Sequence, residues 1–120
     1  MNFDSNLPIY IQIMDLIKRQ VITGDLKEGD KLPSVREIAT QLKVNPNTIQ
    51  RSYQELEREN LVYTQRGMGT FVTEDKQLVK ELKVNIAKNI INNFLDDMKA
   101  IGYSPHEILD LISNRVREGK

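Results

Sequence analysis

Four hydrogen-bonding side chains lie close together near the middle of the chain: Asn45, Asn47, Thr48 and Gln50. Amide and hydroxyl groups can read base edges in the major groove of DNA, and they can also bind phosphate oxygens. No acidic residue occurs from Ile38 through Gln54, so no carboxylate in this segment would repel a nucleic acid. The segment therefore predicts a contact with double-stranded DNA.

Basic side chains flank this segment at Arg36, Lys43, Arg51 and Arg66. A single surface arginine ordinarily forms an exposed salt bridge that contributes little to the stability of the fold. Because these cations accompany the polar segment, we expect Arg36, Arg51 and Arg66 to contact DNA. Gly67 follows Arg66 and would let the chain approach the duplex closely at that point.

The elements that must position these side chains form a helix-turn-helix. Ser34 and Glu37 fit a capping box that opens a short helix ending near residue 42. Asn45 as N-cap and Pro46 as first helical residue then begin a second helix that runs to about residue 59. In such a pair, the first residues of the second helix meet base edges in the major groove.

Further elements surround this motif. An apolar stripe with helical spacing predicts a first helix over residues 9–23. Two runs rich in β-branched and aromatic residues, 61–65 and 70–72, predict two strands. Residues 66–69 between them contain two glycines and predict the tip of a hairpin.

A long amphipathic helix is predicted after the hairpin, over residues 74–99, because apolar residues recur every four positions from Leu78 to Met98. Gly102 interrupts it, and a second capping box at Ser104 opens a final helix. One short helix cannot cover so long a stripe, so we expect a second copy of the tail to pack on it as a homodimer. The alternative is that the stripe folds back on the first helix.

The expected fold is therefore mainly α with a small β hairpin. Residues 1–73 are expected to form a winged helix-turn-helix DNA-binding domain. Residues 74–120 are expected to form a two-helix extension for dimerisation. A chain of 120 residues leaves little room for a separate catalytic domain.

Composition excludes several other classes of protein. The 17 basic and 17 acidic residues give no net charge, so a DNA contact has to depend on where individual cations lie. The absence of cysteine excludes disulfides and thiolate sites, and no apolar run is long enough to span a bilayer. We expect a cytoplasmic protein that is no enzyme and needs no cofactor or metal. His106 and the Asp96–Asp97 pair are more typical of a solvated surface than of a metal or effector site.

The combined motifs resemble the GntR superfamily of bacterial regulators, and the short tail resembles its YtrA-like subfamily. The motifs are Leu32-Pro33-Ser34-Val35-Arg36-Glu37-Ile38-Ala39, Val44-Asn45-Pro46-Asn47-Thr48-Ile49, Tyr53-Gln54-Glu55-Leu56-Glu57 and Gly67-Met68-Gly69-Thr70-Phe71-Val72. The resemblance implies that Arg36 contacts the operator and that Asn45, Asn47 and Thr48 begin the recognition helix. It also implies that Gly67 is the wing-tip glycine.

The chain departs from that family pattern at two positions. Many relatives carry arginine where this chain has Pro46 and Gln50, so the nearest arginine of the recognition helix is Arg51, with phosphate as an alternative partner to a base.

The sequence thus predicts a transcription regulator, a repressor that binds a palindromic operator as a homodimer, with room for an unidentified small-molecule effector. The alternative is a winged-helix module for protein interaction or RNA binding.

Overall fold

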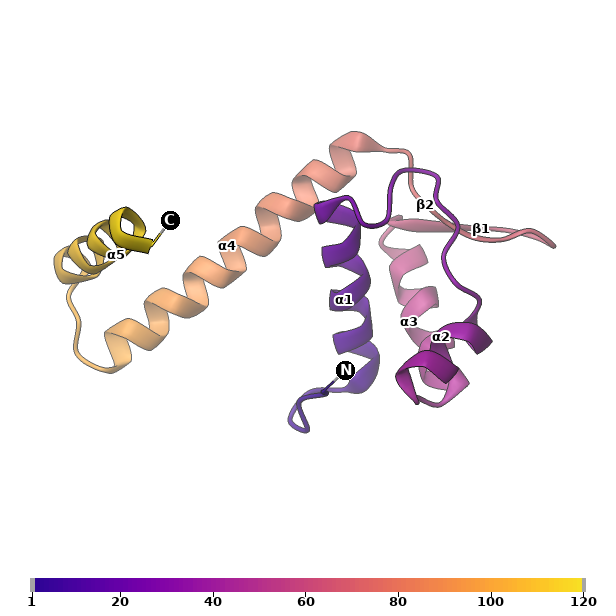
Figure 1. Ribbon diagram of the computed structural model, residues 1–120, viewed down its shortest axis with the longest axis horizontal. Coiled ribbons are helices and arrows are strands. Elements are labelled where there is room, and N and C mark those ends of the chain that lie inside the picture. The colour runs from indigo at the N-terminus through magenta and orange to yellow at the C-terminus, as the bar shows by residue number, and fades with distance from the viewer. Residues whose placement is uncertain (1, 120) are drawn as a thin grey trace. The chain divides into compact units, whose positions relative to one another are not determined.

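The computed structural model describes residues 2–119 and is mainly helical with one small hairpin, as predicted (Figure 1). Its elements, in chain order, are α1 (Ile9–Thr23), α2 (Val35–Leu42), α3 (Pro46–Arg58), β1 (Val62–Gln65), β2 (Gly69–Val72), α4 (Lys76–Ala100) and α5 (Pro105–Gly119). The chain forms two compact units, which divide within α4 after Lys83. The domain division at residue 73 stays a prediction.

The first unit is built around three helices. α3 packs against both α1 and α2, and the hairpin follows at the end of α3 (Figure 1). Their apolar faces and the start of β1 form one core, because helical periodicity places these residues on the inner side of each helix. The buried members include Ile13, Ile17, Val21, Ile38, Ala39, Ile49, Tyr53, Leu56, Val62 and Val72.

The turn between α2 and α3 depends on local side-chain caps. At the start of α2, Ser34 and Glu37 form the predicted capping box, with N–H to oxygen distances of 2.9 and 3.0 Å. α2 ends at Lys43, which adopts a left-handed conformation with φ 57°. Asn45 then caps α3 and Pro46 is its first residue, as predicted. The helix-turn-helix is therefore specified by short-range signals.

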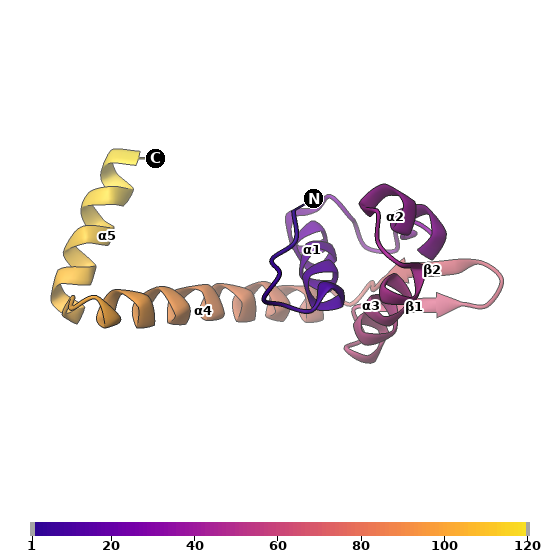
Figure 2. The same cartoon turned by 90° about the horizontal axis from the view of Figure 1, so that it is seen from below.

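The hairpin is a two-stranded antiparallel sheet in which Val62 pairs with Val72 and Gln65 with Gly69. The prediction that Gly69 belongs to the tip was wrong, because it pairs within β2 and leaves only 66–68 as the turn. A bridge from Lys31 to Phe71 extends the sheet on the β2 side. Figure 2 shows the hairpin loop projecting beyond α2 and α3.

The predicted start of the long helix at residue 74 was also wrong, since α4 begins at Lys76. The Thr73 hydroxyl accepts from the Asp75 N–H, and the Asp75 carboxylate accepts from the N–H of Leu78 at 3.1 Å. These bonds hold residues 73–75 outside the helix and cap it. Within the first unit, Val79 and Leu82 of α4 pack against the core.

The second unit contains the rest of α4 together with α5. The second predicted capping box is confirmed, because Ser104 and Glu107 exchange hydrogen bonds of 2.9 and 3.2 Å. The backbone N–H of Ser104 holds the pKa of Glu107 below its ordinary value. Among described residues of this unit only Ile108 is buried in the single chain. Within 2–119 no helix has the length and apolar character needed to cross a membrane.

Candidate nucleic-acid interface

α3 is fixed to the rest of the first unit by two hydrogen bonds from its buried side. The Ser52 hydroxyl donates to the backbone oxygen of Tyr10 in α1 at 2.9 Å. The Tyr53 hydroxyl donates to the backbone oxygen of Pro33 at 2.7 Å. Burial raises the pKa of Tyr53, so this hydroxyl keeps its proton. Both bonds orient α3, and they determine which of its side chains face outward.

The outward face of α3 carries polar and basic groups. Asn47, Gln50 and Arg51 are exposed, and Gln54 lies one turn further along the same face. Thr48, also predicted at the site, is half-buried at the edge of this face. Gln54 was missed by sequence reasoning, although its spacing of seven residues from Asn47 could have identified it.

The start of α3 presents donors and no negative charge. The Asn45 side-chain oxygen accepts from the Asn47 N–H at 2.8 Å, so the amide NH2 of Asn45 remains available as a donor. No acidic residue lies in the first turn. The positive end of the helix dipole therefore favours an anion here.

Arg51 is not extended freely into solvent. Its guanidinium carbon lies 3.7 Å from the centroid of the Tyr10 ring. Stacking on one face of the ring leaves the N–H groups at the edge of the guanidinium available to an acceptor. Arg51 thus lies on the α1 side of the outward face, whereas Asn47 and Gln54 lie at its centre.

Arg36 lies in the first turn of α2, and its side chain is exposed. Its neighbour Glu37 is engaged in the capping box, where the Ser34 backbone N–H lowers the pKa of the carboxyl. The carboxylate of Glu37 is therefore already used in capping the start of α2. Lys43, in the turn before α3, is exposed as well.

The wing presents Arg66 and Gly67 at an exposed turn. Gly67 has a φ of 77°, which is unfavourable for residues with a side chain, and a Cβ there would meet no atom within 4 Å. The backbone conformation, rather than internal packing, therefore restricts this position. Sequence reasoning missed Lys31, whose side chain lies against the wing: a Cβ at Gly69 would lie 2.7 Å from its Cε.

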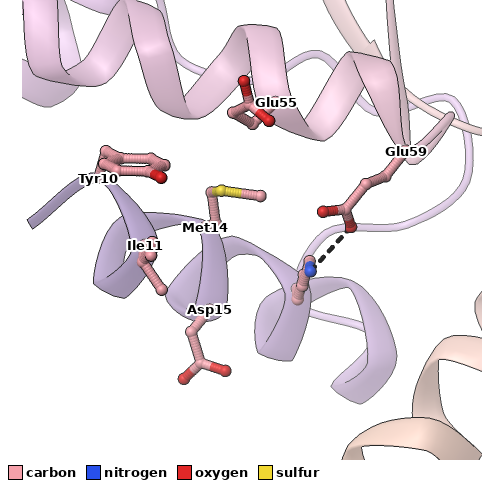
Figure 3. A pocket seen from close by; sticks show the side chains of 7 residues that line it. Tyr10, Ile11, Met14, Asp15, Glu55 and Glu59 are labelled. Atoms are coloured by element: carbon pink, nitrogen blue, oxygen red, sulfur yellow. Dashed lines mark ion pairs between the residues drawn. The ribbon is translucent and has the colours of Figure 1, made fainter. Parts of the chain in front are cut away.

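The C-terminal half of α3 has the opposite charge character. A groove of ≈ 330 Å³ between α1 and α3 is lined by Tyr10, Ile11, Met14, Asp15, Lys18, Glu55 and Glu59 (Figure 3). Lys18 and Glu59 form an ion pair of 2.8 Å across it. Glu55, Glu57 and Glu59 outnumber the basic Arg58 at this end of α3, so the net charge changes from positive around Arg51 to negative beyond it.

No metal centre accompanies this interface, since residues 2–119 contain no group of three or more His, Asp or Glu side chains placed to hold an ion. His106 lies in α5 and pairs with Asp110 at 3.6 Å, both being exposed.

A three-helix unit with a capped helix-turn-helix, a polar recognition face and a glycine-tipped hairpin defines a winged helix-turn-helix DNA-binding protein. Residues 9–72 match the family of bacterial regulatory proteins called the gntR family. The chain belongs to this family and is a DNA-binding transcriptional regulator.

Relatives of similar length support this assignment over nearly the whole chain. The uncharacterized HTH-type transcriptional regulator YhcF of Bacillus subtilis is 46% identical over 117 residues, 98% of this chain and 97% of its own. The HTH-type transcriptional repressor YtrA of the same organism is 41% identical over 97% of this chain and 92% of its own. A solved GntR family transcriptional regulator from Listeria monocytogenes has a TM-score of 0.86 at 45% identity and covers 93% of this chain, with 98% of its own length matched.

Proposed function

We propose that the chain is a repressor that binds a palindromic operator as a homodimer. One observation carries the proposal: the exposed face of α3 is polar and basic over Asn47, Gln50 and Arg51, whereas Glu55 and Glu59 lie near its other end. A helix with charge sorted in this way enters the major groove by its N-terminal end.

Each candidate side chain then has a role that its position supports. Asn47 and Gln50 face the bases, because exposed amides at the start of a recognition helix can pair with base edges. Asn45 and Thr48 hold phosphates beside the groove. The face is polar throughout, which favours DNA over the apolar contact expected of a protein-interaction module.

The cations act around the groove. Arg36 approaches from α2, and Arg51 approaches from the α1 side of α3, where its stacked guanidinium is directed at phosphate. Arg66 and Gly67 bring the wing to the adjacent minor groove, which a narrow turn with glycine at its tip can enter.

Exposed apolar side chains on the second unit support dimerisation. Ile90 and Ile91 of α4 are 52% and 54% exposed, and Val116 of α5 is 67% exposed. A groove of ≈ 370 Å³ with an almost wholly apolar lining lies between the helices, formed by Phe94, Met98, Leu111, Ile112, Arg115 and Val116. Exposed apolar surface of this extent favours a partner, and a second copy is the commonest one.

Repression follows from likeness to a relative named as a repressor, YtrA of Bacillus subtilis. A regulator whose dimer covers an operator excludes other proteins from that DNA, so repression needs no further activity. The unidentified small-molecule effector stays a prediction.

Selection from a random library of DNA duplexes tests the proposal. We expect the purified protein to enrich an inverted repeat at moderate ionic strength, with half-sites about one helical turn or a multiple of it apart. An RNA duplex of the same sequence should not compete, because a helix cannot enter its deep, narrow major groove. Enrichment of no sequence, or equal competition by the RNA duplex, would overturn the proposal.

A further inference from the structure

One acidic side chain of α3 contacts the hairpin directly. The Glu57 carboxylate of α3 accepts two hydrogen bonds from Thr64 in β1. Its Oε2 accepts from the Thr64 backbone N–H at 3.2 Å, and its Oε1 accepts from the Thr64 hydroxyl at 3.2 Å. The recognition helix and the wing are thereby joined by a single side chain that uses both of its oxygens.

The connection continues across the hairpin. Thr64 Oγ1 lies 3.4 Å from Oγ1 of Thr70, its register partner in β2. On the outer edge of β2, the Thr70 backbone oxygen accepts from the N–H of Leu32 at 2.8 Å. The hairpin is therefore held on the β1 edge by Glu57 and on the β2 edge by the segment before α2.

Glu57 differs from the other acids of α3 in what it contacts. Glu59 pairs with Lys18 of α1, and Glu55 pairs with Arg58 on its own helix at 3.3 Å. Glu57 is exposed and has no basic partner within 4.0 Å among the described residues. The two bonds to Thr64 are therefore the side-chain contacts that the structure gives the Glu57 carboxylate among the described residues.

We infer that Glu57 is a positioning residue, which fixes the wing relative to α3 so that Arg66 and Gly67 reach the duplex when the start of α3 is in the major groove. The inference rests on the proposed function. The start of α3 and the wing bind the duplex as one unit only if the angle between them is fixed before binding, because ordering a mobile hairpin upon binding would reduce affinity.

Gel shifts with the selected operator test the inference through Glu57→Gln and Thr64→Val. Glutamine keeps the size of the side chain but removes the charge that strengthens both bonds, and its amide nitrogen can only donate to the Thr64 hydroxyl. Valine removes the hydroxyl while suiting a strand. We expect each variant to lower operator affinity by about 2- to 10-fold, the range of one ordinary hydrogen bond. The double variant should lose less than the product of the two effects, because both act on one contact.

Three further variants separate positioning from general charge and folding. Glu55→Gln removes the same charge from the same helix and should not weaken binding. Thr64→Ser keeps the hydroxyl and should bind like the wild type. In an Arg66→Ala background, Glu57→Gln should have a smaller effect than in the wild type, because the wing has then lost its charged contact and gains less from being positioned.

Hydroxyl-radical footprinting supplies the decisive readout. In Glu57→Gln, protection at the wing should weaken while protection around the start of α3 persists. Wild-type affinity and an unchanged wing footprint in both single variants would overturn the inference. So would a uniform loss over the whole footprint, or an Arg66→Ala variant that binds like the wild type. If instead the wild type selects no duplex, the proposed function itself fails and the inference fails with it.

Discussion

The guanidinium of Arg51 is stacked on the ring of Tyr10, with its central carbon 3.7 Å from the ring centroid. The backbone oxygen of the same Tyr10 accepts a hydrogen bond from Ser52, the next residue of α3. One residue of α1 therefore fixes both the helix that carries Arg51 and the direction of the arginine side chain. A guanidinium held in this way lies at the edge of the recognition face, and under the proposed function we expect it to bind a phosphate and not a base.

Arg51→Ala should therefore weaken binding to the operator and to unrelated duplexes alike. Loss of one phosphate contact should reduce the slope of log affinity against log salt concentration by about one and leave base preference unchanged. Fluorescence anisotropy over a salt series measures both quantities. A selective change at one base pair would instead make Arg51 a base-reading residue.

The ring of Tyr10 should matter to that contact, and its hydroxyl should not. Tyr10→Phe keeps the stacked ring and should bind like the wild type. Tyr10→Leu should lower affinity by a few-fold, since an exposed cation–π pair contributes roughly 0.5–1 kcal/mol. The two variants compared in one anisotropy titration test this, and equal affinities would show that stacking does not position Arg51.

Arg36→Ala should lower operator affinity by about 1–3 kcal/mol with little change in the unfolding temperature, because its side chain is exposed on α2. Arg19→Ala is the matched control, since it removes the same charge from an arginine already paired with Asp15 at 2.8 Å. Gel shifts at constant salt measure the difference. If both variants bind equally, Arg36 does not belong to the interface.

Under the proposed dimerisation through α4 and α5, Ile90→Asp should make the protein monomeric and weaken operator binding, because a carboxylate on an apolar interface loses its hydration without a partner. Asn89→Asp adds the same charge one position away on the polar side of α4 and should remain dimeric. Sedimentation of both variants, with circular dichroism to verify helix content, checks the assignment. A dimeric Ile90→Asp variant would place the interface elsewhere.

The capping box of α2 predicts a dependence of stability on acid. Hydrogen bonding to Ser34 lowers the pKa of Glu37 in the folded state. The stabilising effect of the Glu37 carboxylate is therefore complete when the pH lies above the ordinary pKa of the group, and it is lost as the pH falls through the lowered pKa. Glu37→Gln keeps an acceptor but does not titrate, so the stability difference between wild type and variant should shrink as pH falls through that interval. Thermal unfolding across acid pH measures it. A difference independent of pH would contradict the assignment.

Short-range signals made most of the fold predictable. The capping boxes at Ser34 and Ser104, and the cap at Asn45, were correctly located because each needs residues only a few positions apart. The errors at Gly69 and at the start of α4 arose where two local signals competed. Glycine is common both in turns and at strand ends, and Asp75 proved to be a cap beyond the last strand.

Contacts between distant residues could not be predicted in the same way. Tyr10 and Ser52 are 42 positions apart, and only the packing of α1 against α3 brings the ring under Arg51. The bond from Glu57 to Thr64 spans seven positions, but it crosses the turn from helix to strand, which no single periodicity covers. Such contacts determine how the side chains of the candidate site are oriented. The sequence therefore predicted the positions of these residues better than their roles.

We propose that two copies, joined through α4 and α5, insert the starts of their α3 helices into major grooves on one side of the duplex. Gel shifts with the selected operator, in which about 5 or about 10 base pairs are inserted between the half-sites, test it most directly. The shorter insertion rotates one half-site to the opposite side and should lower affinity to that of a single half-site, and the longer one should restore part of the loss. Equal affinity for all spacings and for one half-site alone would contradict the claim.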